Sequence, residues 1–237
     1  FPGGKGGNKP IYLGILILSC DKFCDLWKPY FSLFWKYYNG SSQVYLGSNS
    51  VIFQGDNIKT IYSGEDIDWS TSCRNILKQI PNKYILLLLE DIFITSKIDT
   101  DRITQHLQYM KVNKVKHIHL VPTPKPDKWI MNQEIGVYEK GAPYRVNVVG
   151  YWDKEYLLRL LLDGESPWDF EIKGSYRTVY DDGFYCLQKP LFSTVHVLEK
   201  GRWLPEAVNY SKEHNISLEI EKRPILSSHT NLKSNLQ

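Results

Sequence analysis

The sequence lacks any apolar run near the roughly 20 residues that a membrane-spanning helix needs. Residues 11–18, one of its apolar stretches, have only the length of a strand. We therefore expect no membrane span, and any association with a membrane to be peripheral.

Cysteine is scarce, and its spacing excludes the usual zinc sites. The 237 residues include four cysteines, at positions 20, 24, 73 and 186, which lack the paired spacing of zinc ligands. Such isolated cysteines are typical of reduced thiols rather than of a disulfide framework. This favours a cytoplasmic protein.

The sequence also lacks a strong excess of one charge and a glycine-rich phosphate loop. Its net charge is +3 and no block of Lys and Arg stands out, so we do not expect a nucleic-acid partner. The first expected strand is followed by Ser-Cys-Asp-Lys at 19–22, without glycine, which weakens the interpretation as a nucleotidyltransferase.

The length and the order of elements indicate one α/β domain. We expect a flexible arm or an expression remnant at 1–10, the domain at 11–220 and a tail at 221–237. Strands are expected at 11–18, 43–46, 58–62, 84–89 and 117–121, and helices at 23–38, 68–80, 99–114 and 154–162. This alternation predicts a mostly parallel central sheet flanked by helices.

The second half is less regular. Segments 135–138 and 145–152 resemble two paired strands. Farther on, Ser166 as N-cap, Pro167 at the first helical position and Gly174 as a stop define a short helix.

Two adjacent carboxylates end the buried strand at 84–89. Ligands of open α/β sheets bind beyond the carboxyl ends of the strands, which is where Glu90 and Asp91 would lie. Hard oxygen ligands suit Mg²⁺ or Mn²⁺ bound to a substrate's phosphates. The alternative is that both acids merely cap the following turn.

Three more carboxylates surround the start of the short helix: Glu165, Asp169 and Glu171. Asp169 has the position of an ordinary capping residue. Glu171 lies one turn in, beside Trp168 and Phe170, where burial would raise its pKa toward the range of a general base.

Five segments together carry a resemblance to a known family. They are Ile-Leu-Ser-Cys-Asp at 17–21, Asp-Trp-Ser at 68–70, Leu-Leu-Glu-Asp-Ile-Phe at 88–93, Gly-Tyr-Trp at 150–152 and Glu-Ser-Pro-Trp-Asp-Phe-Glu at 165–171. In this order they resemble glycosyltransferases of the GT-A (Rossmann-like) fold, especially family-2-like enzymes that build surface polysaccharides.

The resemblance implies a site for a nucleotide-sugar donor, most simply a UDP-sugar. It assigns the donor to Ser19, Cys20, Asp21, Asp66, Arg74, Glu90 and Asp91, and a Mn²⁺ or Mg²⁺ ion to Asp91, Glu90 and His196. The metal motif departs from the usual Asp-x-Asp, because Ile92 stands two positions after Glu90. His196 is also compatible with a purely structural role in a strand.

The resemblance further implies a hexosyltransferase-type enzyme that inverts the anomeric centre with a carboxylate base. The base would be Glu171 or Asp169, with Glu165 third, and a saccharide acceptor would rest on Trp129, Trp152 or Trp168. Each tryptophan could equally belong to the core. An inactive, transferase-like carbohydrate-binding module remains the alternative, favoured by the incomplete metal motif.

Overall fold

A nine-stranded sheet forms the centre of the molecule. The computed structural model describes residues 13–227, so the arm expected at 1–10 lies outside the described residues. The sheet has the order β3-β2-β1-β4-β9-β6-β10-β8-β7, in which β9 and β8 run opposite to the other strands. Its strands are β1 (Leu13–Leu18), β2 (Gln43–Ser48), β3 (Ile58–Tyr62), β4 (Tyr84–Leu89), β6 (His117–His119), β7 (Lys128–Ile130), β8 (Ile135–Tyr138), β9 (Gly150–Asp153) and β10 (Phe184–Leu187).

Two short ribbons stand apart from the main sheet. β5 (Ile92–Ile94) pairs with β11 (Thr194–His196), and β12 (Leu198–Glu199) pairs with β13 (Arg202–Trp203). The first ribbon begins immediately after β4, so the chain leaves the main sheet at Glu90 and Asp91.

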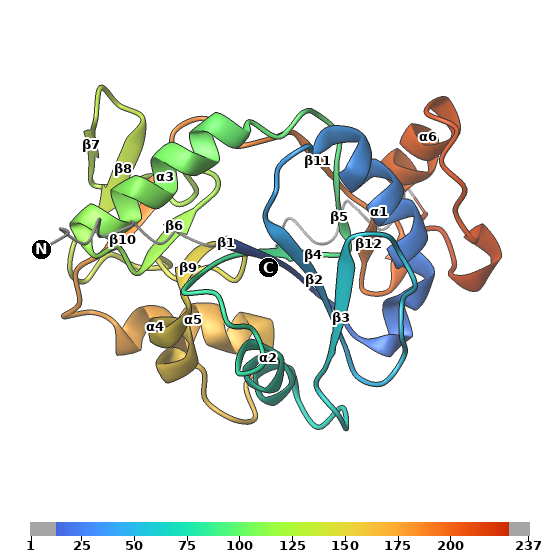
Figure 1. Ribbon diagram of the computed structural model, residues 1–237, viewed down its shortest axis with the longest axis horizontal. Helices are drawn as coiled ribbons and strands as arrows, with labels where there is room; N and C mark the ends of the chain where they lie inside the picture. Colours follow the sequence, from blue (N-terminus) through green and yellow to red (C-terminus); the bar gives the residue numbers. More distant parts are fainter. Residues whose placement is uncertain (1–12, 228–237) are drawn as a thin grey trace, which may run out of the picture.

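Helices cover both faces of the sheet (Figure 1). One apolar cluster joins the sheet to α1 (Cys24–Tyr37), α3 (Thr100–Asn113) and α6 (Pro205–Glu213). The other joins it to α2 (Trp69–Leu77), α4 (Lys154–Leu160) and α5 (Pro167–Arg177). Short 3-10 turns lie at Asp21–Phe23 and Ile220–Lys222. The predicted fold class, α/β with a mostly parallel sheet between helices, is confirmed.

The neighbouring parallel strands β1 and β4 end at the same edge of the sheet. All six residues of β1 are buried, and β1 pairs in parallel with β2 on one side and β4 on the other. A strand covered on both faces reads as a continuous apolar run, which explains the sequences of β1 and β4. Residues 19–21 and 90–91 therefore emerge at the same edge.

Two local predictions are wrong. Segments 135–138 and 145–152 do not pair: β8 lies between β10 and β7, whereas β9 enters the centre of the sheet between β4 and β6. The helix does not stop at Gly174, since α5 continues to Arg177. Gly174 instead allows close packing, because a Cβ there would lie 3.1 Å from the Val146 side chain.

The end of the described chain packs on the domain. Within the predicted tail, Arg223 forms an ion pair with Asp25 at 2.6 Å, and Leu226 is buried.

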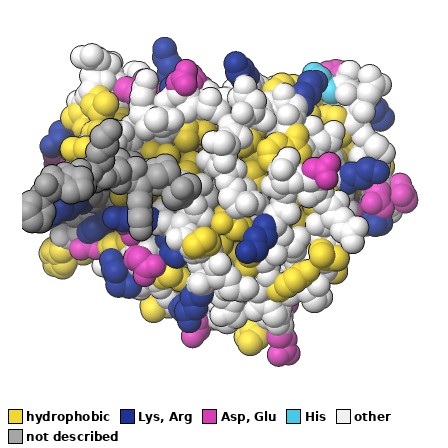
Figure 2. All heavy atoms as spheres, in the orientation of Figure 1, with side chains coloured by type: hydrophobic (Ala, Val, Ile, Leu, Met, Phe, Trp, Pro, Cys, Tyr) yellow, Lys and Arg dark blue, Asp and Glu magenta, His cyan; other side chains and the backbone are white. Residues whose placement is uncertain are grey.

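No helix of residues 13–227 is long and apolar enough to cross a membrane. Basic and acidic side chains are interspersed on the face drawn in Figure 2.

Candidate active site

A cavity of about 580 Å³ opens at the carboxyl edge of the sheet. The polar side chains along it come from the β4–β5 turn, the end of β11, β6, the segment before β9 and α5. They include Asp91, His196, His119, Asn147 and Glu171. Parts of the chain that lie far apart in sequence thus meet at the edge where α/β proteins bind ligands.

Asp91 and His196 form one wall of this cavity. In the antiparallel β5–β11 ribbon His196 is the register partner of Ile92, and the backbone N–H of Val197 donates to the Asp91 carbonyl at 2.9 Å. Burial raises the pKa of Asp91, and the neighbouring His196 opposes that rise. The Asp91 carboxylate and the His196 ring therefore lie close enough to interact electrostatically.

Glu90 lies beside the other acid but does not line the cavity. It is buried, at 7% exposed, and it interacts with Ser19, which follows β1. Burial, followed by the charge of Asp91, raises its pKa to about 8. At neutral pH the Glu90 carboxyl therefore carries its proton for most of the time, and a protonated carboxyl is a poor metal ligand.

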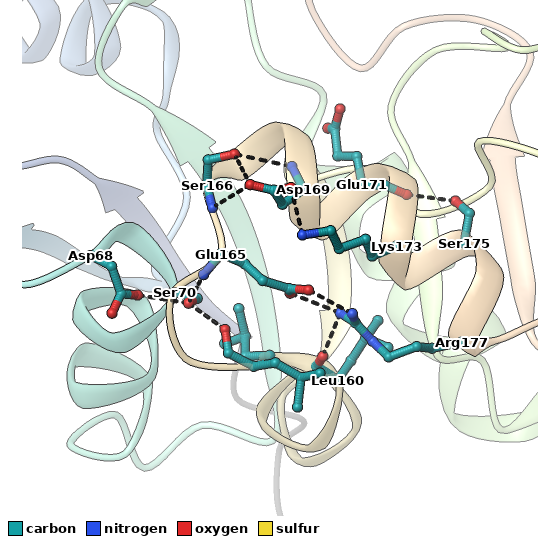
Figure 3. A network of polar contacts seen from close by, with 12 residues as sticks. Asp68, Ser70, Leu160, Glu165, Ser166, Asp169, Glu171, Lys173, Ser175 and Arg177 are labelled. Carbon is teal, nitrogen blue, oxygen red and sulfur yellow. Dashed lines mark hydrogen bonds and ion pairs between the residues drawn. The ribbon is translucent and has the colours of Figure 1, made fainter.

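Glu171 reaches the same cavity from α5. Its Oε1 accepts a hydrogen bond from the backbone N–H of Val148 at 2.9 Å, and its side chain projects away from the Asp169 and Glu165 carboxylates (Figure 3). Burial raises its pKa, and the hydrogen bond from Val148 opposes this. Such a carboxylate has the position and the basicity of a general base.

Asp169 and Glu165 have structural partners instead (Figure 3). Asp169 completes a capping box with Ser166 and pairs with Lys173 at 2.7 Å, while Glu165 forms two hydrogen bonds with Arg177, at 2.6 and 2.9 Å. Neither lines the cavity. The structure thus separates Glu171 from the other two predicted candidates for the base.

The predicted donor residues fall into two groups. Ser19 and Cys20 lie near Glu90, and Asp66 lies near Cys20. Burial, followed by the Glu90 charge, raises the pKa of Cys20 to about 11. Asp21 and Arg74 make structural contacts. The Asp21 carboxylate accepts hydrogen bonds from the backbone at 49–51, and Arg74 pairs with Asp163 beyond α4.

The three predicted sugar-binding tryptophans differ in exposure. Trp168 is 73% exposed and lines the cavity. Trp152 is 0% exposed, stacks on His117 at 4.0 Å between ring centroids and donates to the Val148 carbonyl, so the prediction that it contacts a sugar is wrong. Trp129, on β7, packs against the core and is not among the residues of the cavity.

Among the cavity residues that were not predicted, three carry a buried polar atom without a partner: Tyr30, His119 and Asn147. The Tyr30 hydroxyl, His119 Nδ1 and Asn147 Oδ1 are buried and make no hydrogen bond among the described residues. Burial lowers the pKa of His119 to about 4, so its ring is neutral at pH 7. The pattern His-Ile-His at 117–119 was a possible signal, whereas Asn147 lies in an irregular segment with none.

No protein-family model and no curated protein sequence matches this chain. Its structure is similar to crystal structures of S. aureus TarS. For TarS 1–349 in complex with UDP-GlcNAc the TM-score is 0.47 at 9% identity, over 89% of this chain and 69% of that chain. For the complex with UDP it is 0.47 at 8% identity, over 75% and 60%.

A further TarS structure gives a TM-score of 0.43 at 9% identity, over 75% of this chain and 36% of that chain. The chain thus spans between about a third and two thirds of the TarS structures it resembles. At these identities the likeness concerns the fold alone.

Proposed function

We propose that this chain is a glycosyltransferase that moves a sugar from a nucleotide-diphosphate sugar, most simply a UDP-sugar, to a hydroxyl of a saccharide. One observation carries the proposal. A single cavity at the carboxyl edge of the sheet is lined by Asp91 and His196 from the β4 side and by Glu171 and Trp168 from α5. A group for the leaving diphosphate, a base and a sugar-stacking ring thus share one space.

The charge of the cavity supports a role for a metal ion. Its described lining includes the carboxylates of Asp91 and Glu171 but no lysine or arginine. A diphosphate would be repelled there unless a cation accompanied it, because like charges at close range in a partly buried site interact strongly.

Asp91 and His196 are the residues that would hold Mn²⁺ or Mg²⁺. Among residues 13–227 no group of three or more His, Cys, Asp or Glu gathers as a ready-made metal site. Two protein ligands still fit, since Mg²⁺ is commonly held by one or two carboxylates together with substrate phosphates and water. The ion would supply neutralisation of the charge on the departing diphosphate.

Glu171 supplies the proton chemistry. The acceptor oxygen attacks the anomeric carbon as its proton passes to the Glu171 carboxylate, and the bond from that carbon to the diphosphate oxygen breaks. A single displacement of this kind inverts the anomeric centre. The raised pKa of Glu171 makes its carboxylate a stronger base than an exposed glutamate.

A carbohydrate-binding module is the second candidate. It is favoured by the same finding that the described residues offer no group of three metal ligands, and by the proton that Glu90 retains near pH 7. Such a module would keep the aromatic contact of Trp168 without needing Glu171 as a base.

Thermal shift with a panel of sugar nucleotides, with and without Mn²⁺, tests the proposal, because a ligand of the folded state raises Tm by mass action. We expect one nucleotide-diphosphate family to raise Tm in a manganese-dependent manner. The Asp91→Asn variant should lose that dependence, whereas Asp56→Asn, at an exposed position elsewhere, should keep it. A shift with free sugars and none with any sugar nucleotide would support the binding module instead.

A further inference from the structure

An exposed row of large side chains runs along α5. Trp168, Ile172 and Tyr176 recur every four residues, and Tyr180 follows three residues after the helix ends. They are 73%, 43%, 73% and 86% exposed. Large aromatic side chains that are this exposed and this regularly spaced are unusual in a folded domain.

The other rows of α5 already have partners. Phe170 and Gly174 are buried against the second core cluster, and Asp169 pairs with Lys173 on the helix surface. Positions four residues apart lie one above the other on a helix, so the exposed row forms a surface of its own. It contributes nothing to the core, and its solvent exposure has no structural explanation among the described contacts.

The row begins at the proposed catalytic site. Trp168 lines the cavity, and it lies three residues before Glu171, which makes the two side chains neighbours on the helix surface. At 1.5 Å per residue, Tyr176 stands about 12 Å farther along the axis. The row is therefore a track that leads away from the cavity across the outside of α5.

We propose that this track, defined as Trp168, Ile172, Tyr176 and Tyr180, binds the units of an oligosaccharide acceptor beyond the one that enters the cavity. The inference rests on the proposed function and deepens it, since it makes the preferred acceptor a chain and not a single sugar. Aromatic rings offer an apolar face to the C–H face of a sugar, and the tyrosine hydroxyls add a polar edge that contacts sugar hydroxyl groups.

The shape of the track favours a saccharide over a second copy of the chain. Stable protein interfaces use roughly 20–30 residues a side. On α5 the track is one row of three side chains, bordered by the charged pair Asp169–Lys173, and Tyr180 follows after the helix. A narrow apolar ridge of this kind matches the width of a single polymer chain.

The test is calorimetric titration of the protein with soluble gluco-, chito- and manno-oligosaccharides of one to six units. We expect affinity for at least one series to rise with length beyond the first unit. In the Tyr176→Ala variant the affinity for the longer oligosaccharides should fall by about 3- to 10-fold, as expected for one aromatic contact. Its affinity for the monosaccharide should be unchanged. The control Tyr62→Ala, at another exposed tyrosine, should behave as the unaltered protein.

Three results would overturn the inference: no gain with length in any series, a gain that survives Tyr176→Ala combined with Ile172→Ala, or sedimentation showing a dimer that Tyr176→Ala dissociates. Release of nucleotide diphosphate from sugar nucleotides, measured on the same proteins, tests the proposed glycosyltransferase activity independently of the saccharide track. Tyr176→Ala should hydrolyse donor as the unaltered protein does. A length-dependent gain without any donor hydrolysis would reject the transferase and retain the saccharide track.

Discussion

Glu171 is held by the backbone of Val148. The Val148 N–H donates to Glu171 Oε1 at 2.9 Å, which joins α5 to the segment that leads into β9 across the cavity. Glu171 Oε2 makes no hydrogen bond within residues 13–227, so one oxygen is fixed, and in the proposed reaction the other would take the proton of the acceptor hydroxyl.

The Glu171→Gln variant tests this division of roles. The amide oxygen of glutamine can still accept from Val148, so the fold and donor affinity should be nearly unchanged. Transfer should fall by about 10²–10⁴, the usual effect of losing a general base. Glu155→Gln, at an exposed glutamate on α4, is the matched control. Turnover of Glu171→Gln at the level of the control would remove Glu171 from the mechanism.

The pH dependence of transfer should report the same carboxylate. A base acts in its ionised form, so kcat/KM should rise with pH as Glu171 loses its proton. Because burial raises the pKa of Glu171, this limb should lie above the ordinary range of an exposed glutamate. A pH profile of kcat/KM checks this, and a flat profile from pH 4.5 to 8 would contradict it.

Substitution of Asp91 and His196 should weaken the use of metal. Each of Asp91→Asn and His196→Ala should raise the Mn²⁺ concentration for half-maximal activity by about 10- to 100-fold or more, because even loss of a residue that only orients a metal ligand has an effect of that size. His214→Ala, an exposed histidine on the turn after α6, should not. If all three variants needed the same Mn²⁺ concentration as the unaltered protein, the metal site could not lie at the β5–β11 ribbon.

Glu90 should make the protein less stable as pH rises. Its pKa is about 8 in the folded state against 4.5 for an ordinary glutamate, so between these values unfolding releases a proton. The free energy of unfolding should therefore fall with rising pH, by at most about 1.4 kcal/mol per pH unit from this group. Glu90→Gln should flatten the slope between pH 5 and 8 in urea denaturation. An unchanged slope would show that Glu90 titrates as an exposed acid.

The sequence predicted the parts of the site that follow directly from buried strands and helix starts. A run of six apolar residues ending on Glu90-Asp91 has few interpretations, and a Ser-Pro start with an acid in the second turn placed Glu171 on a helix. The structure confirms the strand and the helix start.

The rest depends on pairing between distant segments, which no local pattern encodes. His196 comes near Asp91 because β5 leaves the sheet and pairs with β11, more than 90 residues later. Trp152 was misjudged because its short segment enters the middle of the sheet, where both of its faces are covered. Glu90 and Asp91 are adjacent in sequence, yet only Asp91 lines the cavity, which the local pattern does not indicate.

Release of nucleotide diphosphate from a panel of sugar nucleotides, with Mn²⁺ and without added acceptor, tests the central claim most directly. We expect slow hydrolysis of one donor that needs manganese, is lost in Asp91→Asn and is reduced in Glu171→Gln. Absence of release from every donor, with and without the oligosaccharide series, would contradict the assignment of this chain as a glycosyltransferase.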